Sequence, residues 1–237
     1  MAYNFLSLVN DVNRRLNEVE LNESNFDSAI GFYSSIKDGV NSSVRYINQV
    51  AYEWPFNHET QQEPLNVGEV RYFLPYDLKT LDMDSFRIKR NDNLNVSTQK
   101  LRNISYEEYL SKYVDAEYDR KTSSYGVPRY VFKTPSLEYG VYPAPDKEYE
   151  IVYEYYKLPV DMIKATDSPS IPEQFRYVIN EGSMYYAYSF RGDLESAQLS
   201  FQKFNQGVES MRSIYINRYD YVRSTVIERR RTGLKVQ

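Results

Sequence analysis

The amino-acid sequence predicts an α+β fold with helices at both ends of the chain and an inserted antiparallel β-rich module. Hydrophobic residues recur at helical spacing up to Trp54 and again after Pro172, whereas they alternate with polar residues in between. The basic C-terminal end does not have the pattern of a packed helix. We therefore expect a helical bundle formed by residues 1–56 and 172–217, a β-rich module over 68–160, and an extended basic C-terminal arm over 218–237.

Two helices are predicted before Trp54. The first carries an apolar stripe at helical spacing, formed by Phe5, Leu8, Val9, Val12, Leu16 and Val19. The second begins near Asn25 or Asp27, either of which can cap it. Its stripe consists of Ala29, Tyr33, Ile36, Val40, Val44, Ile47 and Ala51. It ends at Trp54 because Pro55 disfavours helical geometry in the residue before it.

The middle of the chain reads as short extended segments. The polar stretch over 57–68 predicts a loop or linker. A segment broken at Pro75 follows, and a short alternating segment covers 85–90. A short helix is predicted over 103–114, because Ser105 and Glu108 have the spacing of a capping box. The remaining segments, 128–134 and 136–143, predict strands.

The clearest strand signal lies after the turn sequence Pro-Ala-Pro-Asp of residues 143–146. One face of the predicted strand carries Tyr149, Ile151, Tyr153 and Tyr155, and the other carries Glu150, Val152, Glu154 and Tyr156. This alternation is typical of a half-buried antiparallel strand rather than a central parallel one.

Two more helices are expected after Pro172, which suits a first helical position. The first runs to a turn at Arg191, Gly192 and Asp193. The second has heptad spacing at Leu194, Ala197, Phe201, Phe204, Val208, Met211 and Tyr215. The heptads are few, so this spacing favours an amphipathic helix packed on the body over a coiled coil.

The amino-acid composition excludes several classes of binding site and of protein. The chain has 237 residues, a net charge of −4, 25 tyrosines, no cysteine and one histidine, His58. Disulfides, thiolate metal sites and multi-histidine zinc sites are therefore excluded. The acidic balance argues against generic DNA binding. We expect a soluble protein without a signal peptide, because no stretch approaches the roughly 20 apolar residues of a membrane span.

Candidate chemistry is sparse. Glu107 and Glu108 are neighbouring carboxylates, but with 33 acidic residues such a pair is expected by chance. Asp119, Asp146 and Asp167 are placed in loops, without the spacing of a calcium loop. There is no phosphate-binding glycine motif and no nucleophile elbow. We therefore expect no enzymatic activity, no cofactor and no metal.

The main electrostatic signal is the charge at the C-terminal end. Residues 212–237 carry a net charge of +5, so the rest of the chain sums to −9. Three interpretations stay open: a loose tail, an arm that orders on an acidic partner, or a DNA contact supported by neighbouring tyrosines. The candidate partner-binding residues of the arm are Arg218, Tyr221, Arg223, Val226, Ile227, Arg229, Arg230, Arg231 and Lys235.

The order of several segments resembles the head-to-tail adaptor proteins of tailed phages, the family that includes the tail tubular protein A of short-tailed phages. The segments are DGVNSSVRYINQVAYEWPF (38–56), YFLPYDLKTLDMDSFRI (72–88), LEYGVYPAPDKEYEIVYEYYKLPVDM (137–162) and DSPSIPEQFRYVINEGSMYYAY (167–188). The resemblance covers residues 1 to about 215, and the basic end matches it least.

This resemblance implies a structural virion protein of the neck, assembled in the host cytoplasm. Such adaptors pair a helical bundle with a β-rich domain. They form a ring, usually of twelve copies, between the portal protein and the tail nozzle protein. Double-stranded DNA passes through the ring without specific binding, and no membrane is involved. The abundant tyrosine suits surfaces that are buried on assembly. If the arm orders on a partner, the resemblance makes the portal protein that partner.

Three alternative functions remain open at this stage. The chain could be another neck or tail-tube ring component, such as a stopper or terminator. It could be a peptidoglycan-cleaving virion enzyme, which a cell-wall release assay would reveal. It could be a DNA-binding packaging factor, which retention on DNA at about 150 mM salt would reveal, since charge-driven binding weakens steeply with salt.

Overall fold

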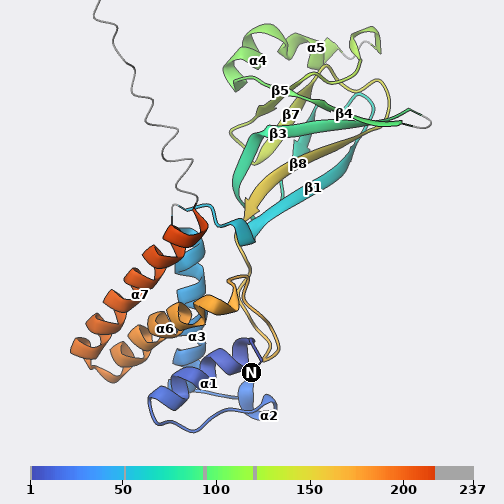
Figure 1. Cartoon of the computed structure of the whole chain (residues 1–237). Coiled ribbons are helices and arrows are strands. Elements are labelled where there is room, and N and C mark those ends of the chain that lie inside the picture. The colour runs from blue at the N-terminus through green and yellow to red at the C-terminus, as the bar shows by residue number, and fades with distance from the viewer. Residues whose placement is uncertain (1, 51, 93–94, 120–121, 217–237) are drawn as a thin grey trace, which may run out of the picture. The chain divides into compact units, whose positions relative to one another are not determined.

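The computed structural model describes the whole chain except residues 1, 51, 93–94, 120–121 and 217–237 (Figure 1). The fold is α+β, with helices towards both ends and antiparallel sheets in the middle, as the sequence predicts. The chain divides into two compact units. The first, here called the helical unit, comprises the described residues of Met1–Trp54 and Asp161–Gln237. The second, the β unit, comprises those of Pro55–Val160.

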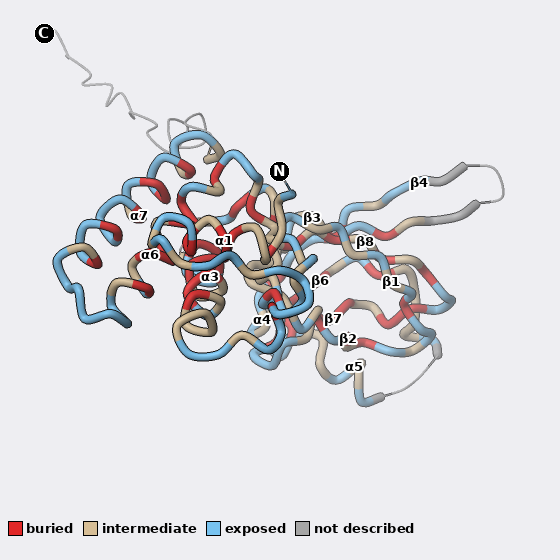
Figure 2. Tube along the Cα trace, turned by 90° about the horizontal axis from the view of Figure 1, so that it is seen from below, coloured by how far each residue is buried: buried red, intermediate tan, exposed pale blue. Residues whose placement is uncertain are grey.

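The helical unit is built around α6, which packs against α1, α3 and α7 (Figure 1). Each helix turns one apolar stripe inwards, and along α7 buried residues recur between exposed turns (Figure 2). Ala197, Phe204, Val208 and Met211 form the buried stripe of α7. The helices are α1 (Phe5–Arg15), α2 (Glu23–Phe26), α3 (Phe32–Gln49), the short 3-10 helix η3 (Glu173–Phe175), α6 (Arg176–Arg191) and α7 (Leu194–Tyr215).

The N-terminal helices differ from the sequence prediction in their limits. The helix α1 ends at Arg15, and Val19 is exposed instead of continuing the stripe. The predicted second helix is two helices, because Gly31 has φ of 63° and ends any continuous helix there. Neither Asn25 nor Asp27 caps the long helix. The cap of α2 is Asn22, whose side chain accepts hydrogen bonds from the backbone of Ser24 and Asn25.

The β unit contains two four-stranded sheets. One has the strand order β1-β8-β3-β4 and is antiparallel throughout. The other has the order β2-β7-β6-β5, and only its β5–β6 pair is parallel. The strands are β1 (His58–Leu65), β2 (Arg71–Phe73), β3 (Leu78–Asp92), β4 (Asn95–Lys100), β5 (Arg102–Asn103), β6 (Tyr130–Lys133), β7 (Glu138–Tyr142) and β8 (Tyr149–Lys157).

The prediction of a loop over 57–68 is wrong, because residues His58–Leu65 form strand β1 beside β8. This strand is polar on both faces, so it lacks the apolar alternation that marks a strand in sequence. It lies at a sheet edge, where only one flank is paired. Glu63 accepts a hydrogen bond of 2.5 Å from the phenol of Tyr139. Hydrophobic periodicity in a sequence cannot predict a hydrogen bond between a carboxylate and a buried phenol.

Three tyrosines of strand β8 belong to the core. As predicted, Tyr149, Ile151, Tyr153 and Tyr155 of β8 are all buried, while residues between them are partly exposed. Tyr153 stacks on Phe86 with ring centroids 4.6 Å apart. Burial raises the pKa of the Tyr155 phenol to about 12, so it stays neutral at physiological pH.

Two short helices, α4 (Tyr106–Lys112) and α5 (Val114–Asp119), complete the β unit. Ser105 caps α4 by accepting a hydrogen bond from the backbone of Glu108, which is one half of the predicted capping box. Tyr109 of α4 stacks on Phe132 of β6 with ring centroids 3.8 Å apart. The Phe132 ring in turn covers Gly140 on the neighbouring strand, where a Cβ atom would lie only 2.1 Å from it. The glycine therefore makes room for the aromatic contact that holds α4 in place.

Candidate interaction surfaces

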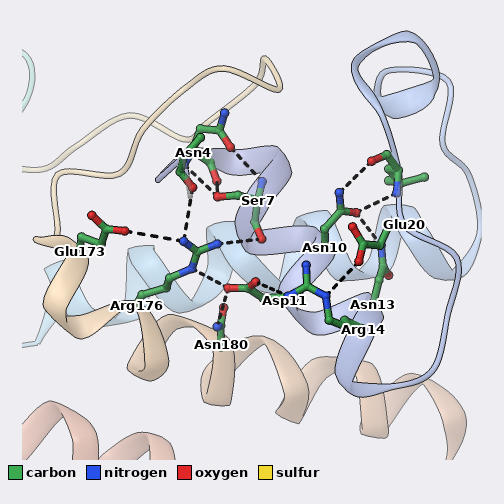
Figure 3. Close-up of polar contacts among 12 residues, drawn as sticks. Asn4, Ser7, Asn10, Asp11, Asn13, Arg14, Glu20, Glu173, Arg176 and Asn180 are labelled. Carbon is green, nitrogen blue, oxygen red and sulfur yellow. Dashed lines mark hydrogen bonds and ion pairs between the residues drawn. The ribbon is translucent and has the colours of Figure 1, made fainter.

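One guanidinium ties the N-terminal helix to α6 (Figure 3). Arg176 donates a hydrogen bond of 2.5 Å to the Asp11 carboxylate and bonds of 3.2 and 3.3 Å to the backbone carbonyls of Ser7 and Ala2. Asn180 donates to the same oxygen of Asp11 at 3.1 Å. The side chains of Arg176 and Asp11 are only 17% and 14% exposed, so this pair is largely withdrawn from water. The contacts fix α1 against the start of α6.

The same face of α1 holds the loop that follows it (Figure 3). The Asn10 side chain donates to the carbonyl of Leu21 and accepts from its backbone N–H, both at 2.8 Å. Arg14 donates to Glu20 at 2.9 Å. Beside these contacts lies an open pocket of about 610 Å³, lined in part by Arg14, Glu173 and Tyr177. Each charged side chain that lines the pocket forms an ion pair, which indicates a structural role.

Both chain segments that lead to the β unit are anchored on α3 within the helical unit. The indole of Trp54 donates to the carbonyl of Ile47 at 2.7 Å and is 1% exposed. The Asn41 amide donates to the carbonyl of Met162 at 2.9 Å and accepts from its N–H at 3.1 Å. Sequence reasoning missed Asn41, because a lone asparagine on a helix gives no signal.

A row of aromatic side chains joins α3, α6 and α7. Ring centroids are 5.2 Å apart between Tyr46 and Phe204, and 5.1 Å apart between Phe201 and Tyr185. Tyr185 in turn lies 5.1 Å from Tyr186. Tyr46, Tyr186 and Phe201 are each at least 37% exposed, so the row forms part of the surface. Exposed aromatic side chains of this kind are typical of protein interfaces.

The heptad spacing of α7 marks an amphipathic helix packed on α6, which is the interpretation that the sequence favours. Two of the heptad positions are nevertheless exposed. Leu194 is 69% and Phe201 37% exposed, because the inward face of α7 shifts to Ser200 and Gly207. The turn predicted at Arg191–Asp193 is confirmed, since Gly192 has φ of 77° and Asp193 caps α7.

The candidate arm residues, from Arg218 to Lys235, lie outside the described residues. The helix before them ends at Tyr215, which is fixed in place. The Gln174 amide donates to the Tyr215 phenol at 3.0 Å, and the Phe175 ring lies 5.5 Å from the Tyr215 ring. The end of α7 therefore lies beside η3.

Three of the candidate carboxylates, Glu108, Asp146 and Asp167, each have a partner of their own. Glu108 pairs with Lys112 at 2.7 Å. Asp167 accepts two backbone N–H bonds of 2.8 Å, from Ile163 and Lys164, which lower the pKa of its carboxyl. Asp146 accepts from the phenol of Tyr149. The side chain of Asp119 lies outside what the structure describes.

Over the described parts of the chain, no group of three His, Cys, Asp or Glu side chains is placed to hold a metal ion. Among the same residues, no helix is both long and apolar enough to cross a membrane.

The exposed aromatic side chains of the helical unit are of the kind that protein interfaces contain. The family model described as SU10 adaptor protein matches residues 3–230. The chain belongs to this family of phage head-to-tail adaptors, which agrees with the resemblance seen in its sequence. A search for related curated proteins found no match.

Proposed function

We propose that the chain forms a ring, of twelve copies, that joins the portal protein to the tail nozzle protein in the virion neck. Membership of the adaptor family carries this proposal. The exposed aromatic row on α3, α6 and α7 supports it, since subunits of a ring bury much of their surface on assembly. The ring has a structural role without catalysis.

The charge distribution supports a channel through which DNA passes without specific binding. Outside residues 212–237 the chain sums to −9. Protein–DNA affinity depends largely on basic contacts to phosphate, so an acidic body gives DNA little to hold. Assembly in the host cytoplasm belongs to the same proposal.

We also propose that residues 218–237 dock on the portal protein. Extended at about 3.3 Å per residue, these 20 residues reach up to about 65 Å. Val226 and Ile227 can add backbone hydrogen bonds to a partner strand. Arg229, Arg230 and Arg231 can pair with carboxylates, where each exposed pair contributes about 0–1 kcal/mol but many copies act together.

Deletion of residues 224–237 tests the arm. The truncated chain should keep the circular dichroism of the full chain, because the described fold ends before these residues. It should not co-assemble with purified portal rings, as seen by electron microscopy and by sedimentation. If the truncated chain caps portal rings at the occupancy of the full chain, attachment must come from the folded units instead.

A further inference from the structure

Strand β2 leaves part of its backbone unpaired at a sheet edge. It is the terminal strand of the order β2-β7-β6-β5. Val141 donates its N–H to the carbonyl of Val70, and Leu74 donates to that of Leu137. Bonded and non-bonded pairs alternate in an antiparallel ladder, so the pair of Phe73 with Glu138 is a non-bonded one. The N–H and C=O of Phe73 therefore point away from β7, towards the open edge.

Three large apolar residues at or next to this edge have exposed side chains. Phe73 is 79%, Tyr76 91% and Leu137 64% exposed. Their backbones are neighbours at this edge, because Phe73 adjoins Leu74, which is bonded to Leu137, and Tyr76 follows two residues later. Single exposed hydrophobic residues are common, but several at one place on a monomer mark an interaction site.

The edge strand β1 of the other sheet is different. The exposed residues of β1 are polar or proline, and Pro64 has no N–H to offer a partner. Strand β1 thus has the features that prevent edge pairing. Strand β2 has none of these protective features at Phe73.

Two carboxylates lie beside the edge, those of Asp77 and Glu138. Asp77 accepts a hydrogen bond from the Tyr155 phenol, and Glu138 accepts one from the Ser136 hydroxyl. Neither carboxylate forms an ion pair with a basic residue in the described part of the chain. The nearby Arg71 is turned away, with its guanidinium on Glu117 at 2.9 and 3.1 Å.

We propose that Phe73, Tyr76, Leu137, Asp77 and Glu138 form a docking edge for an extended segment of another virion protein. The segment adds a strand to β2 through the outward N–H and C=O of Phe73. It places an apolar side chain on the exposed ring surfaces and a Lys or Arg on the two carboxylates. This inference rests on the proposed function, because it needs the chain to be part of a virion.

Photocrosslinking in the virion tests the docking edge. The photoreactive analogue p-benzoylphenylalanine is placed at position 73, or in a second preparation at position 76, with position 118 of α5 as the control. Irradiated virions are digested, and the crosslinked peptides are sequenced by mass spectrometry. Positions 73 and 76 should each crosslink to one segment of a different virion protein that combines apolar and basic residues.

Each other outcome has a defined meaning. If the labelled chain is present in virions but positions 73 and 76 give no crosslink, the docking edge is wrong. A crosslink to a second copy of this chain, or to a segment that lacks basic residues, also overturns it. If the unlabelled chain is itself absent from virions, the proposed function fails, and the inference fails with it.

Charge reversal tests the chemistry of the partner separately. The double variant Asp77→Lys with Glu138→Lys places like charges opposite the basic segment, and the crosslink yield from position 76 should fall by about tenfold. Asp115→Lys reverses an exposed charge on α5 and should leave the yield unchanged. Circular dichroism confirms that both variants fold. An unchanged yield in the double variant would show that the partner segment is not basic.

Discussion

Arg176 joins three parts of the chain through one guanidinium, and its loss leaves a partly buried carboxylate behind. We expect Arg176→Met to lower the free energy of unfolding by about 2 kcal/mol, because Asp11 then loses its main charged partner away from water. Urea denaturation followed by circular dichroism measures the change. Arg14→Met removes a guanidinium that is 53% exposed and should cost less than about 1 kcal/mol. Equal losses in both variants would contradict the role given to Arg176.

We expect the stability of the β unit to depend on pH through the carboxyl group of Glu117. Burial acts to raise the pKa of Glu117, but hydrogen bonds from Arg71 and Tyr109 outweigh it, and the pKa lies below its ordinary value. The Glu117 carboxylate therefore binds a proton more readily in the unfolded chain than in the folded chain. Its contribution to the stability of the fold is present above about pH 4.3, and it is lost as the pH falls through the lower pKa of the folded chain.

The variant Glu117→Gln should be less stable than the natural chain at pH 7. It should also lose less stability than the natural chain between about pH 5 and about pH 3, a range that includes the reference glutamate pKa of about 4.3. Thermal unfolding at a series of pH values measures both effects. Parallel stability curves for the two proteins would mean that Glu117 does not contribute to the acid sensitivity.

At the scale of single elements, the position of α4 depends on a residue without a side chain. Gly140→Ala would place a methyl group 2.1 Å from the Phe132 ring, which also stacks on Tyr109. We expect a loss of about 2 kcal/mol in stability, since overpacking of this kind costs roughly 1–3 kcal/mol. Gly126→Ala is the control, because its new Cβ meets only Pro143 at 3.5 Å. A loss as large in the control would rule out crowding as the cause.

Elements with one apolar face could be predicted from the sequence, and those without one could not. Strand β8 alternates tyrosine with glutamate, and its inward residues are the ones predicted. Strand β1 alternates polar residues with polar residues, so only its pairing with β8 defines it. The long helix predicted from Asn25 fails because one positive φ, at Gly31, outweighs the continuing apolar period.

Contacts between residues that are far apart in the sequence could not be predicted for a different reason. Asp11 and Arg176 are 165 residues apart, and no local pattern relates them. Phe73 and Leu137 come together only because β2 pairs with β7. Hydrophobic periodicity reports which face of an element is buried, whereas such pairs depend on the order of strands and helices in space.

At the scale of the whole molecule, the β unit is an insertion between Trp54 and Asp161 of the helical unit. Its first and last strands are neighbours, with His58 opposite Tyr156. Near its two ends the insertion therefore enters and leaves the sheet at positions about one strand spacing apart, roughly 5 Å. A folded unit with adjacent ends can be removed or inserted without stretching the rest of the chain.

We therefore expect each unit to fold without the other. Residues 55–160 expressed alone should give the circular dichroism of a β protein and unfold cooperatively on heating. A second chain, in which a short Gly-Ser linker joins Trp54 to Asp161, should be helical. Trp54 is the only tryptophan and is 1% exposed, so its fluorescence reports on the helical unit alone. Blue-shifted emission in the linked chain, matching the full chain, would show that the Trp54 anchor on α3 persists without the β unit. Emission at the wavelength of a solvated indole, or an unfolded 55–160 fragment, would mean that the two units need each other to fold.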